Sequence, residues 1–236
     1  MRTSAGSFGT GRVSVQRRRG SLSLRVDGTY ASSYQPGSAL TGSVWDALAA
    51  PLAWLPRDRR RSVLILGLGG GSAARLAREL APKARIVGVE ASGEVIKAAR
   101  RWFELDALDV QVVHGCARQY LRRCRARFDL VIEDVFVGRG RSVHKPDWLP
   151  DPGLVAASRR VNPGGLLVSN SIDETAEVAA TVRSLYPSSV RIAVEDYDNT
   201  ILVGGPGPLD ARGLRMATAA HPLLRQTLPK LRFRRG

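Results

Sequence analysis

The chain has 236 residues, 44% of them hydrophobic, which is enough for one domain with a buried core and a small appendage. It has no run of eighteen apolar residues and no signal-peptide core near its start, so we expect a cytoplasmic protein without a membrane span. The formal net charge of +15 comes from 36 basic residues, 32 of them arginine, which leaves both a solvated basic surface and a nucleic-acid binder open as interpretations.

The first sixty residues predict an appendage to the main domain. Residues 1–20 are rich in Gly, Ser and Arg and predict a flexible basic arm. Alternating apolar positions around an Asp-Gly turn in SLSLRVDGTYASSY (21–34) predict a β-hairpin. Apolar residues at helical spacing over 43–55 predict a helix that breaks or kinks at Pro51. We therefore expect a small hairpin-and-helix unit over 21–60.

From residue 62 onward, strand and helix patterns alternate. Strands are predicted at 63–67, 86–90, 110–113, 129–133 and 165–170, and helices at 72–80, 93–104, 117–123, 151–161 and 174–185. Continuous apolar strands separated by helices indicate an α/β fold with a parallel sheet covered on both faces. Two final strands, 190–194 and 200–204, are too close for a crossover and must pair as an antiparallel hairpin. This ending favours the methyltransferase variant of the doubly wound fold over the dehydrogenase variant. A C-terminal helix and a basic tail are expected over 207–236.

A glycine-rich turn follows the first strand of this domain. In LILGLGGGSAARLA (64–77), the glycines are Gly67, Gly69, Gly70 and Gly71. Glycine permits positive φ and close approach of a ligand, and the helix behind the turn offers unpaired N–H groups. The next strand ends in Glu90, where an acid can accept hydrogen bonds from both ribose hydroxyls of an adenosine. The pair predicts an adenosine site, in NAD or in adenosylmethionine, and the terminal hairpin favours adenosylmethionine.

An ordered set of motifs over about residues 21–205 resembles the spermidine synthase family (polyamine aminopropyltransferases) and its methyltransferase-like relatives. The motifs are LRVDG, VLILGLGGGSAARL, IVGVEASGEVIKAAR, VVHGCARQYL, FDLVIEDVF and VNPGGLLVSN. The resemblance implies a seven-stranded Rossmann-like domain over 61–206 with a small N-terminal β-rich piece, often dimeric, so we expect a homodimer. The implied ligand is S-adenosylmethionine or its decarboxylated form.

The same resemblance implies which residues contact the nucleotide. Besides the glycine turn and Glu90, it points to Ala91, Gly115, Cys116 and Ala117. Cys116 stands where the family usually has the Asp that contacts the adenine amino group. The adenine contact must then be weaker or come from backbone near Ala117.

The chain departs from the family where the polyamine binds. Aminopropyltransferases carry D-x-x-D-P after the fourth strand; here Asp134 is kept, but Val137 replaces the second Asp and Gly138 the Pro, and the family's N-terminal Gln falls at Ala31. A diamine is doubly charged, so the lost carboxylate removes a charge complement and a proton acceptor. We therefore predict an adenosylmethionine-dependent methyltransferase acting on a small molecule or a peptide. An aminopropyltransferase with an altered polyamine pocket and a non-catalytic adenosine-binding or interaction protein are the alternatives.

Catalysis is assigned to Asp134 and His144. Methyl transfer needs mainly positioning of the nucleophile, so few catalytic side chains are required. Asp134 ends the fourth strand at the ligand edge of the sheet and is expected to orient the cofactor or to accept a substrate proton. His144 lies in the polar loop 137–151 and is the one histidine expected as a base.

Five further residues are expected on the substrate side. Arg139 and Arg141, in the same loop, could receive an anionic group of the substrate. Tyr30, Tyr34 and Trp45 of the appendage are expected to wall that side. No metal site is expected, because the two cysteines have no cluster of ligands around them. The Asn/Asp-Pro-Pro-aromatic tetrad of nucleic-acid methyltransferases is missing from the sequence, so nucleic acid is not the expected partner.

Overall fold

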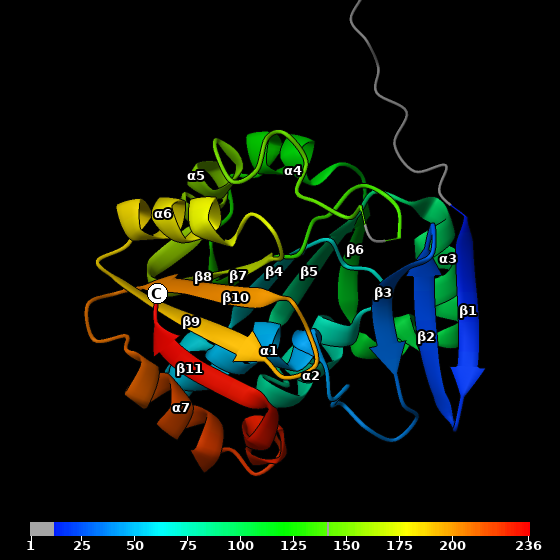
Figure 1. Ribbon diagram of the computed structural model, residues 1–236, viewed down its shortest axis with the longest axis horizontal. Helices are drawn as coiled ribbons and strands as arrows, with labels where there is room; N and C mark the ends of the chain where they lie inside the picture. Colours follow the sequence, from blue (N-terminus) through cyan, green and yellow to red (C-terminus); the bar gives the residue numbers. More distant parts are fainter. Residues whose placement is uncertain (1–11, 141) are drawn as a thin grey trace, which may run out of the picture.

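The computed structural model describes residues 12–140 and 142–236, and within them two sheets lie side by side (Figure 1). The smaller sheet is antiparallel with the order β1-β2-β3. Its strands are β1 (Val13–Arg18), β2 (Ser21–Val26) and β3 (Thr29–Tyr34). The hairpin predicted from the Asp-Gly turn is therefore confirmed as β2 and β3.

The prediction of a flexible arm over 1–20 is wrong for residues 13–18, which form β1. The strand pairs along its whole length with β2, from Val13 opposite Val26 to Arg18 opposite Ser21. Val13 and Val15 pack against the buried cluster around Leu24. Two alternating valines thus carry the strand, a signal too short to stand out from the glycine, serine and arginine around it. The rest of the predicted arm, residues 1–11, lies outside the described residues.

The larger sheet has the strand order β11-β9-β10-β8-β7-β4-β5-β6. Its strands are β4 (Ser62–Leu66), β5 (Arg85–Glu90), β6 (Val110–His114), β7 (Phe128–Glu133), β8 (Val161–Ser171), β9 (Ser188–Val194), β10 (Thr200–Gly205) and β11 (Leu231–Arg235). The five strands from β6 to β8 pair in parallel, whereas β10 is antiparallel to both β8 and β9. The predicted sheet and its terminal hairpin are confirmed. The chain reverses its direction of progress between β4 and β7, and the crevice at such a switch point is where ligands bind.

An eighth strand, β11, replaces the predicted basic tail. It pairs antiparallel with β9, placing Leu231 opposite Val194 and Phe233 opposite Ile192. Leu231 is buried, and Phe233 packs against the same core. The alternation Leu-Arg-Phe-Arg-Arg is a half-buried strand pattern that its arginine content obscured. The helix expected before it is present as α7 (Ala211–Ala220), followed by the 3-10 helix η4 (Leu224–Lys230).

Helices cover both faces of the large sheet. They are α1 (Val44–Ala49), α2 (Ser72–Leu80), α3 (Gly93–Trp102), α4 (Ala117–Arg123), α5 (Gly153–Ser158) and α6 (Thr175–Leu185), with shorter 3-10 helices η1 (Ala50–Trp54), η2 (Arg57–Arg59) and η3 (Leu105–Leu108). Strand β4 sends Val63 and Ile65 into the core with α1, α2 and α7, and Leu64 and Leu66 into the core with α4, α5 and α6. Two cores therefore sandwich the sheet, while α3 also contacts the small sheet.

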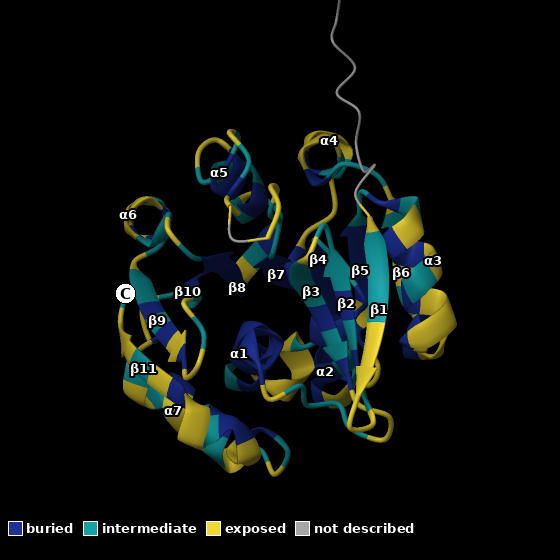
Figure 2. Cartoon of the chain, turned by 45° about the vertical axis from the view of Figure 1, so that its right-hand side comes forward, coloured by how far each residue is buried: buried dark blue, intermediate teal, exposed yellow. Residues whose placement is uncertain are grey.

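Helix α1 is buried on all sides, as the dark colouring in Figure 2 shows. It continues into η1, which contains Pro51, so the predicted break at this proline is confirmed. The one charged residue of the helix, Asp46, accepts hydrogen bonds from the backbone N and hydroxyl of Thr41 and from the N of Gly42, at 2.8–2.9 Å. These bonds fix the entry into the helix, and with it the position of Trp45. No helix in the described ranges is long and apolar enough to cross a membrane.

Candidate functional site

The glycine turn between β4 and α2 lies directly against the end of β7. Gly67, Gly69 and Gly71 have φ values of 85°, 55° and 86°, in the left-handed region that favours glycine. A Cβ on Gly67 would collide with the backbone carbonyl of Asp134, and a Cβ on Gly70 would crowd Ser32. The turn therefore requires glycine at these positions, while Leu68 between them is buried in the core.

Strand β3 of the small sheet closes one side of the glycine turn. The N of Gly70 donates to the Ser32 Oγ at 2.6 Å. The N of Ser33 donates to the Ser72 Oγ at 3.0 Å, and that hydroxyl donates to the Ser33 carbonyl at 2.7 Å. The appendage is thus part of the site. The sequence offered no signal for these serines, because small polar residues on a strand form no motif.

Glu90 ends β5 and holds the turn from the opposite side. Its Oε2 accepts from the N of Gly69 at 2.9 Å, and its Oε1 accepts from the N of Ser92 at 3.0 Å. Burial raises the pKa of Glu90, while backbone N–H groups, including that of Ala91, act in the opposite direction. The N of Gly115 donates to the Glu90 carbonyl at 2.8 Å. The structure therefore brings the predicted residues of three separate motifs to one edge of the sheet.

The two residues after Gly115 begin α4. Cys116 is the N-cap residue, with a half-buried free thiol that does not cap the helix, and Ala117 is buried in the first turn. A Cβ added to Gly115 would meet nothing within 4 Å, so there is open space beside Glu90. An adenine contact at these residues stays a prediction.

Asp134 lies at the carboxyl end of the central strand β7, held between α1 and β8. Its Oδ2 accepts from the Trp45 Nε1 at 3.2 Å, and its Oδ1 accepts from the Asn170 Nδ2 at 2.8 Å. Asn170 in turn accepts from the Asn199 Nδ2 at 2.9 Å. Burial raises the pKa of Asp134 to about 6, although Asn170 and the charge of Lys145 act against the rise. A carboxyl group with this pKa accepts a proton readily near neutral pH.

Beside Asp134, a buried ion pair anchors the loop that follows β7. The Nζ of Lys145 lies 2.7 and 2.9 Å from the two carboxylate oxygens of Glu133, and each side chain is only 1% exposed. The Ser169 hydroxyl donates to Glu133 at 2.6 Å, and the backbone N of Lys145 donates to Glu174 at 2.6 Å. The other oxygen of Glu174 is buried and has no hydrogen-bond partner among the described residues. Glu133, Asp134 and Glu174 are thus grouped around Lys145, which gives this corner an excess of negative charge.

The loop beyond Asp134 folds back on itself and reaches the small sheet. Val137 and His144 form an isolated antiparallel bridge, with N–O distances of 2.9 and 3.0 Å. The N of Gly140 donates to the Asp27 carbonyl at 3.2 Å, and the Thr29 hydroxyl donates to the Gly140 carbonyl at 3.4 Å. The β2–β3 turn and the loop after β7 therefore meet across the site.

Comparison with known proteins shows which families this geometry resembles. Residues 63–165 match the family described as methyltransferase domain. The fold of the chain is shared with spermidine synthases: a probable spermidine synthase from Corynebacterium glutamicum superposes with a TM-score of 0.73 at 19% identity, covering 99% of this chain and 91% of that one. Human methyltransferase-like protein 13, solved in complex with SAH, superposes with a TM-score of 0.65 at 23% identity, covering 80% and 93%.

Two curated relatives show the same dual resemblance. A probable polyamine aminopropyl transferase of Bifidobacterium longum is 32% identical over 133 residues, which cover 56% of this chain and 28% of that protein. An eEF1A lysine and N-terminal methyltransferase homolog of Drosophila pseudoobscura pseudoobscura is 28% identical over 173 residues, which cover 68% and 25%. This chain thus spans about a quarter of the length of these relatives.

Two of the predicted site residues lie beside each other at the carboxyl edge of the large sheet. Asp134 is at the ligand edge of the sheet, and Trp45 reaches it from α1. Tyr30, which is also expected to wall the substrate side, packs edge-on against Trp45 with ring centroids 5.0 Å apart. Asn170 was missed, although it lies near the end of β8 at the same sheet edge as Asp134. Asn199 follows a turn and carried no signal.

Other predicted residues do not converge on Asp134. The exposed His144 imidazole lies 3.0 Å from the Ser142 carbonyl and contacts no catalytic candidate among the described residues. Arg139 is 83% exposed and faces Asp27 at 4.0 Å. Arg141 lies outside the described residues. No observation on the described residues therefore supports an anionic substrate at this loop.

The prediction that Tyr34 walls the substrate side is wrong. Tyr34 is 4% exposed, its hydroxyl donates to Glu104 at 2.5 Å, and its ring packs against Phe103. A register shift between Leu24 and Arg25 leaves Ala31 unpaired, so Tyr34 faces the core between the small sheet and α3. Tyr30, four residues earlier, faces Trp45 instead.

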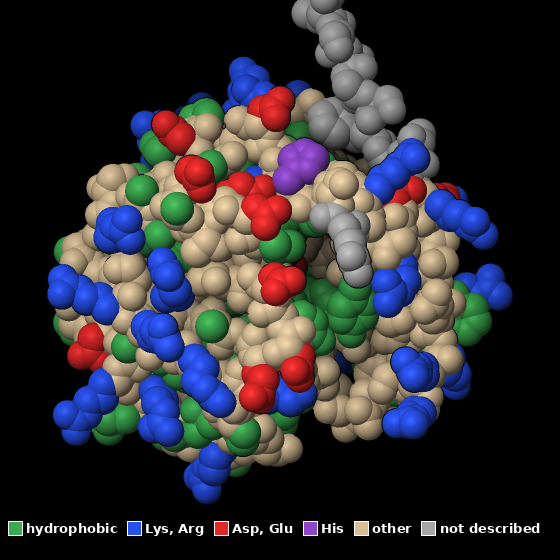
Figure 3. All heavy atoms as spheres, in the orientation of Figure 1, with side chains coloured by type: hydrophobic (Ala, Val, Ile, Leu, Met, Phe, Trp, Pro, Cys, Tyr) green, Lys and Arg blue, Asp and Glu red, His purple; other side chains and the backbone are tan. Residues whose placement is uncertain are grey.

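Acidic side chains gather on the face that carries the loop after β7. In Figure 3 they lie beside a central patch of hydrophobic side chains, while most Lys and Arg lie toward the periphery. The β9–β10 turn contributes Asp196 and Asp198, the latter adjacent to Asn199 of the Asp134 network. This face therefore presents local negative charge in a protein whose formal net charge is +15.

Proposed function

We propose that this protein is an S-adenosylmethionine-dependent methyltransferase whose acceptor is an amine, carried by a small molecule or by a peptide. The observation that carries the proposal is the carboxyl group of Asp134, poised by burial at a pKa of about 6 and held beside the glycine turn by Trp45 and Asn170. A protonated amine must lose a proton before its nitrogen can act as a nucleophile, and Asp134 supplies the acceptor for that proton.

The residues around the glycine turn fit the cofactor. The turn from Gly67 to Gly71 packs so closely on Asp134 and Ser32 that it requires glycine, and Glu90 presents a carboxylate for the ribose hydroxyls. The open space beside Gly115 leaves room for an adenine. When bound, adenosylmethionine supplies an electrophilic methyl group. The protein then has to orient the acceptor, exclude water and remove a proton.

The local charge favours a cationic acceptor. A protein with a net charge of +15 repels ammonium groups unless carboxylates attract them locally. Such carboxylates are present as Glu133, Asp134 and Glu174 around Lys145. The eEF1A lysine and N-terminal methyltransferase homolog acts, by its name, on amino groups, which supports the same class of acceptor. A homodimer and a cytoplasmic location stay predictions alongside this proposal.

The test measures transfer of a labelled methyl group from adenosylmethionine to amines. Putrescine, a lysine-containing peptide blocked at its N-terminus and a peptide with a free N-terminal amine serve as acceptors, with succinate as the anionic comparison. We expect transfer to at least one amine, and its loss by about a hundredfold in Asp134→Asn, the lower range for removing a general base. Glu177→Gln, an exposed acid on α6, is the matched control and should leave transfer unchanged. Transfer to succinate alone, or full activity in Asp134→Asn, would contradict the proposal.

Aminopropyl transfer is the second candidate, because the Bifidobacterium longum relative is named a probable polyamine aminopropyl transferase. The second carboxylate of the aminopropyltransferase pattern is Val137 here, and this side chain is 42% exposed at the Val137–His144 bridge. Incubation with decarboxylated adenosylmethionine and putrescine separates the two reactions. Formation of spermidine would favour this second candidate, and we expect none.

A further inference from the structure

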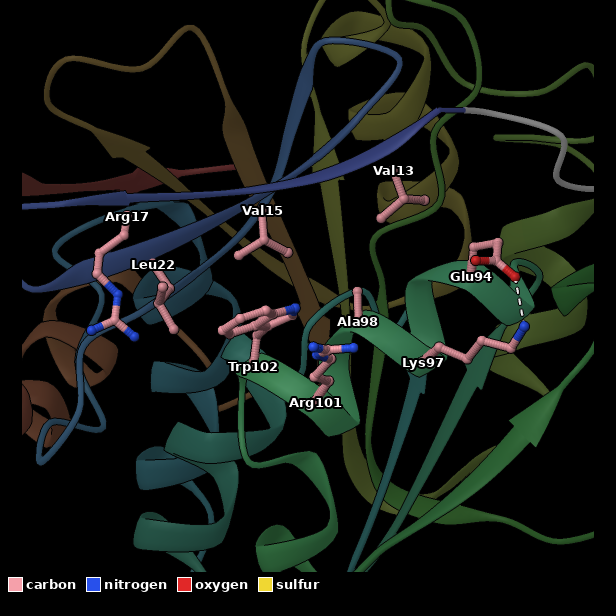
Figure 4. Close-up of a pocket in the computed structure, with 9 residues that line it drawn as sticks. All are labelled: Val13, Val15, Arg17, Leu22, Glu94, Lys97, Ala98, Arg101 and Trp102. Carbon is pink, nitrogen blue, oxygen red and sulfur yellow. Dashed lines mark hydrogen bonds and ion pairs between the residues drawn. The ribbon is translucent and has the colours of Figure 1, made fainter.

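A groove of about 570 Å³ lies between β1 and α3, remote in the fold from the Asp134 network. Figure 4 shows Val13 and Val15 of β1 facing Ala98 and Trp102 of α3 across this groove. Trp102 is 42% exposed, which makes it one of three exposed large hydrophobic residues in the described part of the chain. Exposed aromatic and aliphatic side chains gathered in a concave surface mark an interaction site more often than isolated ones do.

The charge around the groove is strongly positive. Arg17, Lys97 and Arg101 line it, and the guanidinium of Arg101 lies 5.1 Å from the Trp102 ring centroid. The one acid of the lining, Glu94, is paired with Lys97 at 2.8 Å. Two cations are therefore left to attract an anionic ligand, and Arg18 and Arg19 follow Arg17 at the end of β1.

Strand β1 also offers a free edge. In the order β1-β2-β3 it pairs with β2 alone, so the backbone N–H and C=O groups on its other side are unpaired within the described sheet. An extended segment can add to such an edge as a further strand and place alternate side chains into a neighbouring pocket. A strand added to β1 would lie along the groove and over Trp102.

We propose that this groove docks an extended acidic segment of a partner protein, which adds to the edge of β1 and places apolar side chains against Val15 and Trp102. Charge decides between the possible occupants. A second copy of the chain would bring two clusters of arginine together, and residues 1–11 of the chain contain no acid. An aliphatic floor with a strand edge suits a peptide, whereas single-stranded nucleic acid is bound mainly by stacking on aromatic rings.

The probe is a fluorescein-labelled octapeptide that alternates Glu and Val, titrated with the full chain and followed by fluorescence anisotropy. We expect saturable binding that weakens at least tenfold in the double variant Arg17→Glu/Arg101→Glu. The double variant Arg122→Glu/Arg123→Glu is the matched control, because it reverses the same number of exposed arginines on α4. It should bind the peptide within twofold of the unchanged protein. Binding of adenosylhomocysteine should be the same in both variants, which keeps this test separate from that of the proposed function.

Modified peptides test the added strand. Only alternate amides of an added strand face β1, so N-methylation of the odd or of the even amides should abolish binding in one peptide and spare it in the other. Several results would overturn the proposal: no binding of the Glu-Val peptide, equal loss in both arginine variants, or equal binding of a Lys-Val peptide. Two more would assign the groove otherwise, namely displacement by a twelve-nucleotide oligouridylate, or a dimer in sedimentation that only Arg17→Glu/Arg101→Glu dissociates.

Discussion

Replacing Lys145, the cation of the buried Glu133–Lys145 pair, with an uncharged residue should lower the free energy of unfolding substantially. Lys145→Met keeps most of the side-chain volume but leaves the Glu133 carboxylate, 1% exposed, without its counterion. Breaking such a pair from one side costs about 3–5 kcal/mol, because the remaining charge stays buried. The Lys145 Nζ also donates to the Val135 carbonyl at 3.2 Å, so a second acceptor loses its partner. We expect the free energy of unfolding to fall by about 3–5 kcal/mol.

Urea unfolding followed by circular dichroism measures this loss. With a slope of about 2 kcal/mol per molar urea, the midpoint should fall by roughly 2 M. Adding Glu133→Gln to Lys145→Met should recover at least half of the loss, because the amide is uncharged and can still accept from Ser169. Lys97→Met is the matched control: its pair with Glu94 is 76% and 63% exposed and screened by solvent, so the urea midpoint should stay unchanged.

Two results would refute this reasoning. One is a loss below about 1 kcal/mol in Lys145→Met, which would mean that water or rearrangement replaces the lysine at little cost. The other is a double variant as unstable as the single one, which would mean that Lys145 acts through packing and not through the charge of Glu133.

Four more predictions address the glycine turn, Glu90 and Asp134. Because burial raises the pKa of Asp134 to about 6, the rate of methyl transfer should rise through pH 6, and Asp134→Asn should remove this inflection. Because the pKa of Asp134 is higher in the folded protein than in the unfolded chain, the folded protein binds this proton more tightly. The contribution of Asp134 to the free energy of unfolding should therefore fall as pH rises toward 6, which urea unfolding at each pH measures. Glu90→Gln should weaken adenosylhomocysteine binding by about tenfold to a hundredfold in calorimetry, since hydrogen bonds to a charged group contribute about 1.5–3 kcal/mol, while the exposed Glu94→Gln should not change it. Gly67→Ala should lower the thermal stability, because Gly67 has a positive φ and an added Cβ would collide with the Asp134 carbonyl. Gly115→Ala is the control, since its Cβ meets open space, and it should be as stable as the unchanged protein. Equal stability of the two variants would contradict the close packing of the turn on β7.

The helices and strands could be predicted from the sequence where one hydrophobic pattern extends over the whole helix or strand. The buried parallel strands and the helices between them are long, apolar and regularly spaced, and the helix limits 72–80 and 117–123 agree with α2 and α4. Strands β1 and β11 were missed because each has only two apolar residues, set among arginines. Both strands also depend on neighbours distant in sequence: β11 pairs with β9, and β1 packs against α3.

The sequence predicts those residues of the candidate site that lie at the ends of parallel strands. The positions of Asp134, Glu90 and the glycine turn follow from the rule that ligands bind at the carboxyl edge of a parallel sheet. Tyr34 and Tyr30 could not be distinguished, because both lie on the same hairpin and only the packing of α1 decides which one meets Trp45. The partner of Glu133 was equally hidden, since Lys145 reaches it from the far end of a polar loop.

The arginines of strand β11 lie along an open edge of the large sheet and oppose aggregation there. It is the last strand on its side of the large sheet, and Arg232, Arg234 and Arg235 are exposed along it. A bare sheet edge is a template on which other chains aggregate, and a row of like charges prevents that pairing by repulsion. Leu231 and Phe233 meanwhile seal the core beneath it. The same residues that suggest a nucleic-acid binder when read as a string thus keep the molecule from self-association at this edge.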